Sequence, residues 1–183
     1  MLMKYGLPYK EVVFNRKALE LVVKVISYKH NWTRGEISNG TKSNRSSEIA
    51  WLGDRELLAM LLRMVKKINI DSRWNLSITG VEAVQFGKYG KGDFYGWHID
   101  EHKQPVNGNV RKISMTLFLN EDYEGGEFDL EIYKPETDPR YKTFKLPFGS
   151  AIFFRSDQWH RVRPIISGNR ESLVAWFYGP PYI

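Results

Sequence analysis

The sequence contains no cysteine among its 183 residues. A chain without thiols forms no disulfide, holds no zinc or iron–sulfur cluster through thiolates, and has no cysteine nucleophile. Long apolar runs are also missing, and none approaches the roughly 18 consecutive residues that mark a transmembrane helix. Residues 1–9 lack the apolar core of a signal peptide. These absences predict a protein of the cytoplasm with no membrane partner.

The charge balance is basic, with 27 Lys and Arg against 21 Asp and Glu and a net charge of +6. Such a balance suits acidic small molecules, nucleic acid or an acidic protein surface, and it selects none of them. Hydrophobic residues make up 42% of the chain and aromatic residues 14%, enough for a folded core. We find no internal repeat and no composition boundary, so we predict a single domain over residues 1–183.

Two segments in the first half of the chain have the apolar periodicity of helices. They are residues 17–28 and residues 54–68, the second with Asp54 as a plausible N-cap. Residues 33–47, between them, are rich in Gly, Asn and Ser. We interpret this stretch as a long surface loop, either a functional lid or a plain linker.

Residues after about position 76 have the patterns of strands. Apolar and polar residues alternate over 113–119 and over 128–132, and the second of these reads as a half-buried strand. Residues 151–154 form a continuous apolar run, as expected for a strand buried on both faces. Residues 172–178 are rich in aromatic and β-branched residues. Turn residues occur at 124–126, 134–135 and 147–149. These patterns predict an antiparallel β-sandwich or barrel supported by the N-terminal helices.

The chain has only four histidines, at positions 30, 98, 102 and 160. His98 and Asp100 are two residues apart, so in an extended chain they point the same way and could bind one metal ion. His160 follows the buried run 151–154 and could return beside them from a facing strand. Two histidines and one carboxylate on one face are typical of non-haem Fe(II) oxygenases.

Arg170 lies ten residues after His160. Pro164 and the pair Gly168-Asn169 suggest a turn that brings the start of the last strand back beside His160. The rigid fork of an arginine is suited to a dicarboxylate, because it bonds both oxygens of one carboxylate. An isolated arginine is otherwise most often a solvated surface charge.

From about Gly80 to Gly179 the chain resembles the iron- and 2-oxoglutarate-dependent dioxygenases. Within them it is most similar to the prolyl 4-hydroxylase-like group and its PKHD-type hydroxylases. The resemblance depends on motifs that occur in the same order as in that family: Tyr89-Gly90-x-Gly92, Tyr95, His98-x-Asp100, Arg111, Glu124-Gly125-Gly126-Glu127, Pro147-x-Gly149, His160 and a basic residue ten positions later. A weaker similarity extends back to Arg45-Ser46 and Ala50-Trp51-Leu52.

The resemblance implies a double-stranded β-helix, or jelly roll. Residues 76–183 would be its catalytic core, and residues 1–75 would supply helical support and a lid loop. It implies that His98, Asp100 and His160 bind iron. Arg170 and Tyr89 would bind the distal carboxylate of 2-oxoglutarate. Collagen-type prolyl hydroxylases usually have Lys at the position of Arg170, which weakens the case for a collagen-like substrate.

The implied activity is hydroxylation of a C–H bond with Fe(II), 2-oxoglutarate and O₂, releasing succinate and CO₂ and supported by L-ascorbate. We expect a protein or peptide partner, with a peptidyl proline as the substrate residue. Two alternatives stay open. One is the same chemistry on a nucleic acid or a small metabolite, although no aromatic–basic nucleic-acid motif supports it. The other is a jelly-roll binding module without catalysis. The oligomeric state is also open.

Several further residues have two interpretations. Tyr95 could line the pocket or belong to the core, and His102 is expected in a loop. His30 is expected at a helix end in a structural role. Asp157 could orient the second ring nitrogen of His160 or be a turn residue. Arg161 and Arg163 could be solvated or could favour an acidic substrate. Residues 33–47 and 101–109 are expected to close over the substrate.

Overall fold

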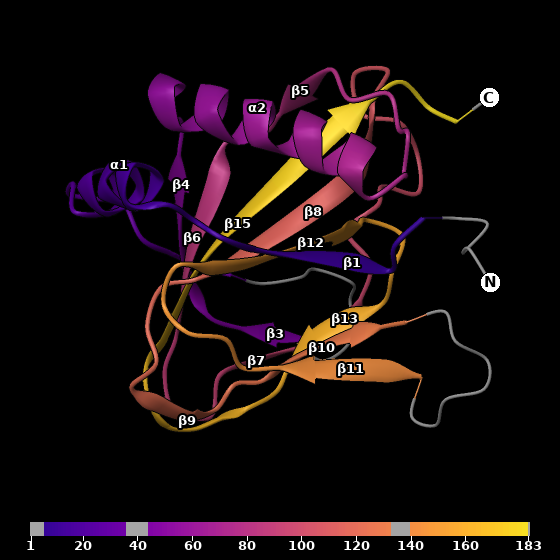
Figure 1. Ribbon diagram of the computed structural model, residues 1–183. Helices are drawn as coiled ribbons and strands as arrows, with labels where there is room; N and C mark the ends of the chain where they lie inside the picture. Colours follow the sequence, from indigo (N-terminus) through magenta and orange to yellow (C-terminus); the bar gives the residue numbers. More distant parts are fainter. Residues whose placement is uncertain (1–5, 36–43, 133–139, 183) are drawn as a thin grey trace.

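Two β-sheets face each other, and two helices cover the outer side of the larger sheet (Figure 1). This computed structural model describes residues 6–35, 44–132 and 140–182. The helices are α1 (Arg16–Ile26) and α2 (Arg55–Asp71). In this described part of the chain, no helix is long and apolar enough to cross a membrane.

The larger sheet has eight strands in the order β1-β12-β8-β15-β6-β4-β2, with β5 paired to β15. In chain order these are β1 (Tyr9–Val13), β2 (Thr33–Arg34), β4 (Glu48–Leu52), β5 (Gly80–Val81), β6 (Val84–Tyr89), β8 (Val110–Phe118), β12 (Ser150–Arg155) and β15 (Arg170–Gly179). Each of these pairings is antiparallel.

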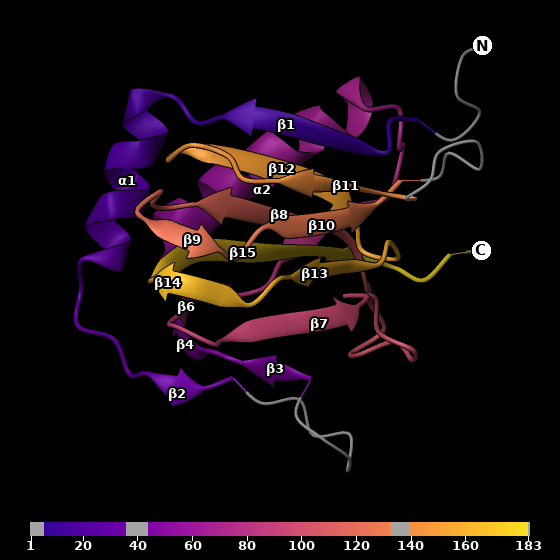
Figure 2. The ribbon, with the colours of Figure 1, turned by 90° about the horizontal axis from the view of Figure 1, so that it is seen from below.

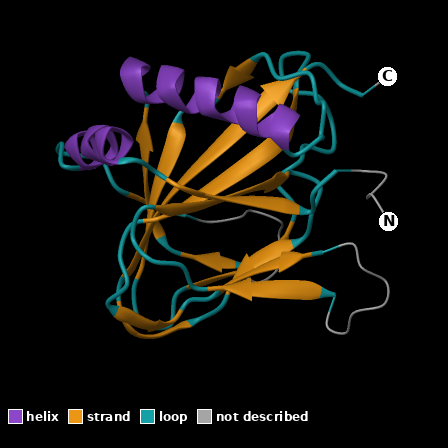
Figure 3. Cartoon of the chain, viewed as in Figure 1, coloured by secondary structure: helices purple, strands orange, loops and turns teal. Residues whose placement is uncertain are grey.

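The smaller sheet has five strands in the order β11-β10-β13-β7-β3 (Figure 2). They are β3 (Arg45–Ser46), β7 (Phe94–His98), β10 (Phe128–Glu131), β11 (Tyr141–Phe144) and β13 (His160–Val162). A further antiparallel pair joins β9 (Tyr123–Gly125) to β14 (Ile165–Gly168). Two facing antiparallel sheets with helices against one of them form a supported jelly roll, so the predicted fold is confirmed (Figure 3).

The larger sheet is buried on both of its faces. The helices pack on its outer face through Leu57, Leu61 and Val65 of α2, in one cluster with Ile113 and Leu173 of the sheet. A second cluster fills the space between the two sheets and includes the following residues: Phe118, Phe128, Leu130, Phe144, Ile152, Phe154 and Val162. This double burial explains the continuous apolar run at 151–154, which is confirmed as β12.

Strand β15 contributes side chains to both faces of the larger sheet. Successive side chains of a strand point to opposite faces. Leu173, Ala175 and Phe177 join the cluster under the helices. The opposite face of β15 lines a cavity between the two sheets, through Arg170, Ser172, Val174 and Trp176. The alternation within β15 therefore separates structural residues from candidate functional ones.

Both predicted helices are present, with their ends shifted by a few residues. The side chain of Asp54 accepts a hydrogen bond from the backbone N–H of Leu57 at 2.9 Å, which confirms it as the N-cap of α2. Asn15 caps α1 in the same way through Ala18. Caps depend on residues next to each other in the sequence, which is why they could be predicted.

The prediction for the N-terminal segment missed its strands. β1 and β4 join the larger sheet beside β12 and β6, so residues 1–75 supply more than helices and a loop. The stretch 33–47 was predicted as a continuous loop, but its two ends form β2 and β3, one on each sheet. Its central part, 36–43, and the turn predicted at 134–135 lie outside the described residues.

The prediction that residues 128–132 form a half-buried strand was wrong at Asp129. Its side chain is 0% exposed, although it points away from the interior face that Phe128 and Leu130 occupy. Arg161, Arg163 and Thr143 cover it and donate hydrogen bonds to its carboxylate. The pattern of alternation is correct, but one arginine of β13 and one just after it bury the polar side of β10.

Candidate metal centre and its cavity

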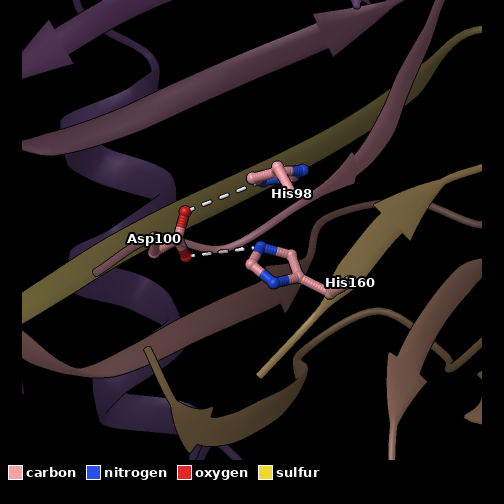
Figure 4. Close-up of side chains that lie close together, drawn as sticks. All are labelled: His98, Asp100 and His160. Carbon is pink, nitrogen blue, oxygen red and sulfur yellow. Dashed lines mark ion pairs between the residues drawn. The ribbon is translucent and has the colours of Figure 1, made fainter. Parts of the chain in front are cut away.

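His98, Asp100 and His160 come together between the two sheets, as Figure 4 shows. His98 ends β7, Asp100 lies two residues after it, and His160 begins the neighbouring strand β13. The Nε2 atom of His98 lies 3.7 Å from Oδ1 of Asp100, and Nε2 of His160 lies 3.3 Å from Oδ2. The three possible ligand atoms all lie within 4.8 Å of one another. One metal ion could contact all three.

A β-bulge in β7 aims His98 into the interior. His160 pairs with His98, and Val162 pairs with Tyr95, so three steps along β7 match two steps along β13. The extra residue lets Tyr95 and His98 face the same side, which regular alternation would forbid. Their rings stack in parallel, with centroids 3.5 Å apart. Tyr95 thus lines the cavity and buttresses a candidate ligand.

Backbone carbonyl groups set the orientation of both imidazoles. Nδ1 of His98 lies 2.8 Å from the carbonyl oxygen of Gly96, and Nδ1 of His160 lies 3.0 Å from that of Gln158. A carbonyl oxygen only accepts, so each Nδ1–H donates and each Nε2 keeps its lone pair for a metal. The interpretation of Asp157 as the partner of His160 was wrong. Asp157 is instead held by the guanidinium of Arg155.

The electrostatics of the three groups also suit a cation. Burial, together with the neighbouring His160, lowers the pKa of His98 to about 3. Burial by itself would raise the pKa of Asp100, but the nearby histidines and the Ser114 hydroxyl outweigh it and hold that pKa below its ordinary value. At neutral pH the site therefore presents a neutral His98 and an ionised Asp100. Two imidazole nitrogens and one carboxylate oxygen match the donor set of non-haem Fe(II).

Arg170 lies in the wall of the same cavity, on β15. It is 1% exposed, and its Nη1 donates to the Ser172 hydroxyl at 3.0 Å. Its Nε and Nη2 atoms are buried with no close hydrogen-bond partner in the described part of the chain, and the Tyr123 hydroxyl lies near the guanidinium. Unmatched buried donors are costly and call for an acceptor. A carboxylate in the cavity would supply one, so the residues present fit 2-oxoglutarate.

The position of Arg170 in the fold differs from the predicted one. The turn was expected to place Arg170 directly beside His160, but residues 165–168 form β14, and Arg170 belongs to the opposite sheet. It faces the histidines across the cavity and pairs in register with Tyr89 of β6. The centre of the Tyr89 ring lies 5.5 Å from the guanidinium carbon. Gly126 belongs to the predicted turn at 124–126 and lies where the aliphatic part of the Arg170 side chain passes. A Cβ atom at Gly126 would lie 3.1 Å from Cδ of Arg170.

Several polar residues that line the cavity were not proposed as site residues from the sequence, among them Arg45 of β3, Gln85 of β6 and Trp176 of β15. Arg45 donates to Gln85 at 2.6 Å, and its guanidinium carbon lies 4.7 Å from the centre of the Tyr95 ring. The indole N–H of Trp176 is buried with no partner among the described residues. Counting in steps of two from Arg170 along the last strand would have pointed to Trp176.

The other two histidines of the sequence lie apart from the three candidate ligands. His102 is in a loop, as predicted, and lines a separate cleft with Glu82 and Arg111. His30 contacts the carbonyl oxygen of Ile26 and packs against aromatic rings, in a structural role.

Arg161 and Arg163 are partly exposed, and the two cations share one buried carboxylate. Both donate to Asp129, at 2.7 and 2.8 Å. Their charge is therefore partly neutralised within the protein.

Comparisons with known proteins agree with this geometry. The chain is 41% identical to a PKHD-type hydroxylase of Picosynechococcus sp. over 98 residues, which are 52% of this chain and 42% of that protein. It is 32% identical to a PKHD-type hydroxylase of Hyphomonas neptunium over 152 residues, covering 79% and 63%. The chain thus spans less than two thirds of the length of either relative.

Solved structures share the fold. A prolyl-4-hydroxylase from Pseudomonas putida superposes with a TM-score of 0.67 at 20% identity, covering 93% of this chain and 92% of that one. The viral collagen prolyl hydroxylase from Paramecium Bursaria Chlorella virus-1 superposes with a TM-score of 0.63 at 16% identity, covering 97% of both. Residues 84–178 match the family described as the 2OG-Fe(II) oxygenase superfamily. This matched segment is more than half of the chain, and we conclude that the chain belongs to the 2OG-Fe(II) oxygenase superfamily.

Proposed function

We propose that this chain is a 2-oxoglutarate-dependent hydroxylase in which His98, Asp100 and His160 bind Fe(II). When bound, ferrous iron and 2-oxoglutarate supply the oxidative chemistry that hydroxylates a C–H bond with O₂ and releases succinate and CO₂. The residues of the chain bind, orient and shield the reactants. The observation that carries the proposal is the shared cavity, with three ligand side chains and, across from them, a buried arginine with two unmatched donors.

Arg170 and Tyr89 are the proposed binding site for the distal carboxylate of 2-oxoglutarate. Two free N–H donors of one guanidinium match the two oxygens of a carboxylate. Burial of the guanidinium strengthens that pairing, because little water competes for it. Phe118 and Tyr89 flank the guanidinium at 5.4 and 5.5 Å.

The proposed substrate is a peptidyl proline. Two observations support this choice. The relatives are PKHD-type hydroxylases, and one structural neighbour is a prolyl hydroxylase in complex with a peptide fragment of hypoxia inducible factor. In this chain, the Trp176 indole N–H is free to meet a peptide carbonyl in the cavity that holds the candidate ligands. Action as a single domain in the cytoplasm, with support from ascorbate, remains a prediction from the sequence.

The test is succinate formation by the purified chain with Fe(II), 2-oxoglutarate, O₂ and a panel of proline-containing peptides. We expect succinate and a +16 Da peptide product, both lost in the His160→Ala variant. His30→Gln is the matched control, because His30 packs on the helix side of the larger sheet. Succinate without any modified peptide would contradict the peptide substrate, and nucleic-acid oligomers in the same assay would test the alternative class. Absence of both iron and 2-oxoglutarate binding would contradict the enzyme itself.

A further inference from the structure

Two buried serine hydroxyls meet behind the carboxylate of Asp100. Ser114 lies on β8 and is 0% exposed, and Ser156 follows β12 and is 1% exposed. The Ser114 Oγ atom lies 2.8 Å from Oδ2 of Asp100 and 2.9 Å from the Ser156 Oγ atom. The three polar groups form one chain that runs away from the candidate metal centre into the protein.

The chemistry of these three groups fixes the direction of the hydrogen bonds between them. A serine hydroxyl has one hydrogen to donate, and an ionised carboxylate only accepts. The Ser114 hydroxyl donates to Oδ2 of Asp100. Its single hydrogen is then in use, so in the contact with Ser156 its lone pair accepts from the Ser156 hydroxyl. The order is Ser156 to Ser114 to Asp100.

The backbone of Ser156 holds the same aspartate from its other end. The Ser156 carbonyl oxygen accepts from the backbone N–H groups of Asp100 and Glu101, at 2.9 and 3.0 Å. The Ser156 N–H donates to the Lys112 carbonyl oxygen at 3.1 Å, which ties this corner to β8 two residues before Ser114. Asp100 thus has its main chain and its side chain fixed by the same pair of strands.

The two carboxylate oxygens of Asp100 end up with different roles. Oδ2 accepts the Ser114 hydrogen bond and lies 3.3 Å from Nε2 of His160, whereas Oδ1 lies 3.7 Å from Nε2 of His98 with no hydrogen bond from another described side chain. We propose that Ser156 and Ser114 are positioning residues that lock this carboxylate and leave Oδ1 as its metal-binding oxygen. The inference rests on the proposed function, because it assumes that Asp100 binds a metal ion.

Metal affinity measured directly tests the inference without any need for turnover. Free Mn(II), followed by its electron paramagnetic resonance signal, serves as the probe in titrations of the metal-free protein. Partners of metal ligands typically change affinity by about 10- to 100-fold. We expect Ser114→Ala to weaken Mn(II) binding by about 10-fold, and Ser114→Thr, which keeps the hydroxyl, to bind nearly as tightly as the original chain.

The direction of the hydrogen bonds, from Ser156 through Ser114 to Asp100, makes a sharper prediction. Ser156→Ala should weaken Mn(II) binding less than Ser114→Ala, because Ser114 would still donate to Asp100. The double variant should bind no worse than Ser114→Ala alone, since Ser156 acts through Ser114. A purely structural role would instead give additive losses. Ser72→Ala is the matched control, because Ser72 has a buried hydroxyl with no hydrogen-bond partner among the described residues.

The outcomes separate the two proposals. If the unaltered chain binds no Mn(II), the proposed metal site is wrong and this inference falls with it. If the unaltered chain binds Mn(II) and Ser114→Ala binds it equally well, the metal site stands and the inference is overturned. A larger loss in Ser156→Ala than in Ser114→Ala would overturn it too. If Ser114→Ala does not fold, Ser114→Cys, which keeps the volume but donates weakly, takes its place and is expected to show the same loss.

Discussion

Arg170 is a buried cation that uses only part of its hydrogen-bonding capacity within the described residues. An unmatched buried donor lowers stability, by about 1–3 kcal/mol for each group. Such a residue is explained by a ligand that completes its hydrogen bonds. The position of Arg170 across the cavity from the candidate metal ligands makes a dicarboxylate the fitting partner.

Replacing Arg170 by Met should separate ligand binding from stability. We expect Arg170→Met to weaken 2-oxoglutarate binding by about 100-fold, since two charge-assisted hydrogen bonds are lost. The free energy of unfolding without ligand should stay constant or rise by about 1 kcal/mol, because unmatched donors are removed. Anaerobic calorimetry with Mn(II) and urea unfolding measure the two quantities.

Arg161→Met is the matched control for that experiment. Arg161 is paired with Asp129 on the outer side of the smaller sheet, so its loss should lower stability and leave 2-oxoglutarate binding intact. A large loss of stability in Arg170→Met with unchanged 2-oxoglutarate affinity would show that Arg170 is a structural residue.

Among the elements, β10 and β13 are joined by charge as well as by backbone pairing. Asp129 of β10 is fully buried under Arg161 of β13 and Arg163, the residue that follows β13. Burial would raise the pKa of Asp129, but the hydrogen bonds from Arg163, Thr143 and Arg161 outweigh it and lower that pKa. Because β13 also carries His160, this network supports the strand that presents a candidate ligand.

The Asp129 network predicts a stability that depends on pH. A depressed pKa in the folded state stabilises the fold fully above the unfolded value of about 3.9, and the gain is lost as pH falls through the folded pKa. We expect Asp129→Asn to lower the free energy of unfolding by about 2 kcal/mol at pH 7. The difference from the unaltered chain should shrink between about pH 4 and pH 2. Urea unfolding over this range measures it, and a difference that stays constant with pH would contradict the ion-pair explanation.

The N-cap of α2 is a second test at the level of elements. Asp54 accepts from the Leu57 N–H at the start of the helix that covers the larger sheet. Asp54→Ala should lower the free energy of unfolding by about 1 kcal/mol. Asp71→Ala, which removes only an exposed pair with Lys67 at the other end of α2, should change it by less than about 0.5 kcal/mol. Equal effects in thermal unfolding would argue against capping as the cause.

At the scale of the whole molecule, the cavity joins groups that lie far apart in the chain. The candidate metal ligands come from β7, the residues just after it, and β13 of the smaller sheet, and Arg170 comes from β15 of the larger one. A metal ion and 2-oxoglutarate bound together across the cavity would bind only to the folded state. Binding should therefore stabilise the jelly roll as a unit.

Thermal unfolding with Mn(II) and 2-oxoglutarate checks this expectation. At ligand concentrations about 100 times Kd, binding adds about 2.7 kcal/mol. For a domain of this size, that raises Tm by about 5–10 °C. EDTA should reverse the effect of the metal, and Arg170→Met should abolish the part contributed by 2-oxoglutarate. A Tm that does not respond to Mn(II) would contradict the metal site.

Much of the fold follows from local patterns. The Asp54 cap, the periodicity of α2 and the apolar run of β12 each depend on neighbouring residues, so the sequence alone predicts them. The candidate ligands could be named for the same reason, since the His98-x-Asp100 spacing and the order of the motifs are properties of the chain. Their roles as ligands remain a proposal.

Other features were decided by pairing between distant strands. The bulge that turns Tyr95 and His98 to one side depends on the register with β13, and the burial of Asp129 depends on two arginines in and just after that strand. The hydroxyl chain behind Asp100 joins β8 to the end of β12. The sequence specifies which way each strand alternates, but only the tertiary structure decides which faces meet, because contacts between distant residues form only when the sheets pack.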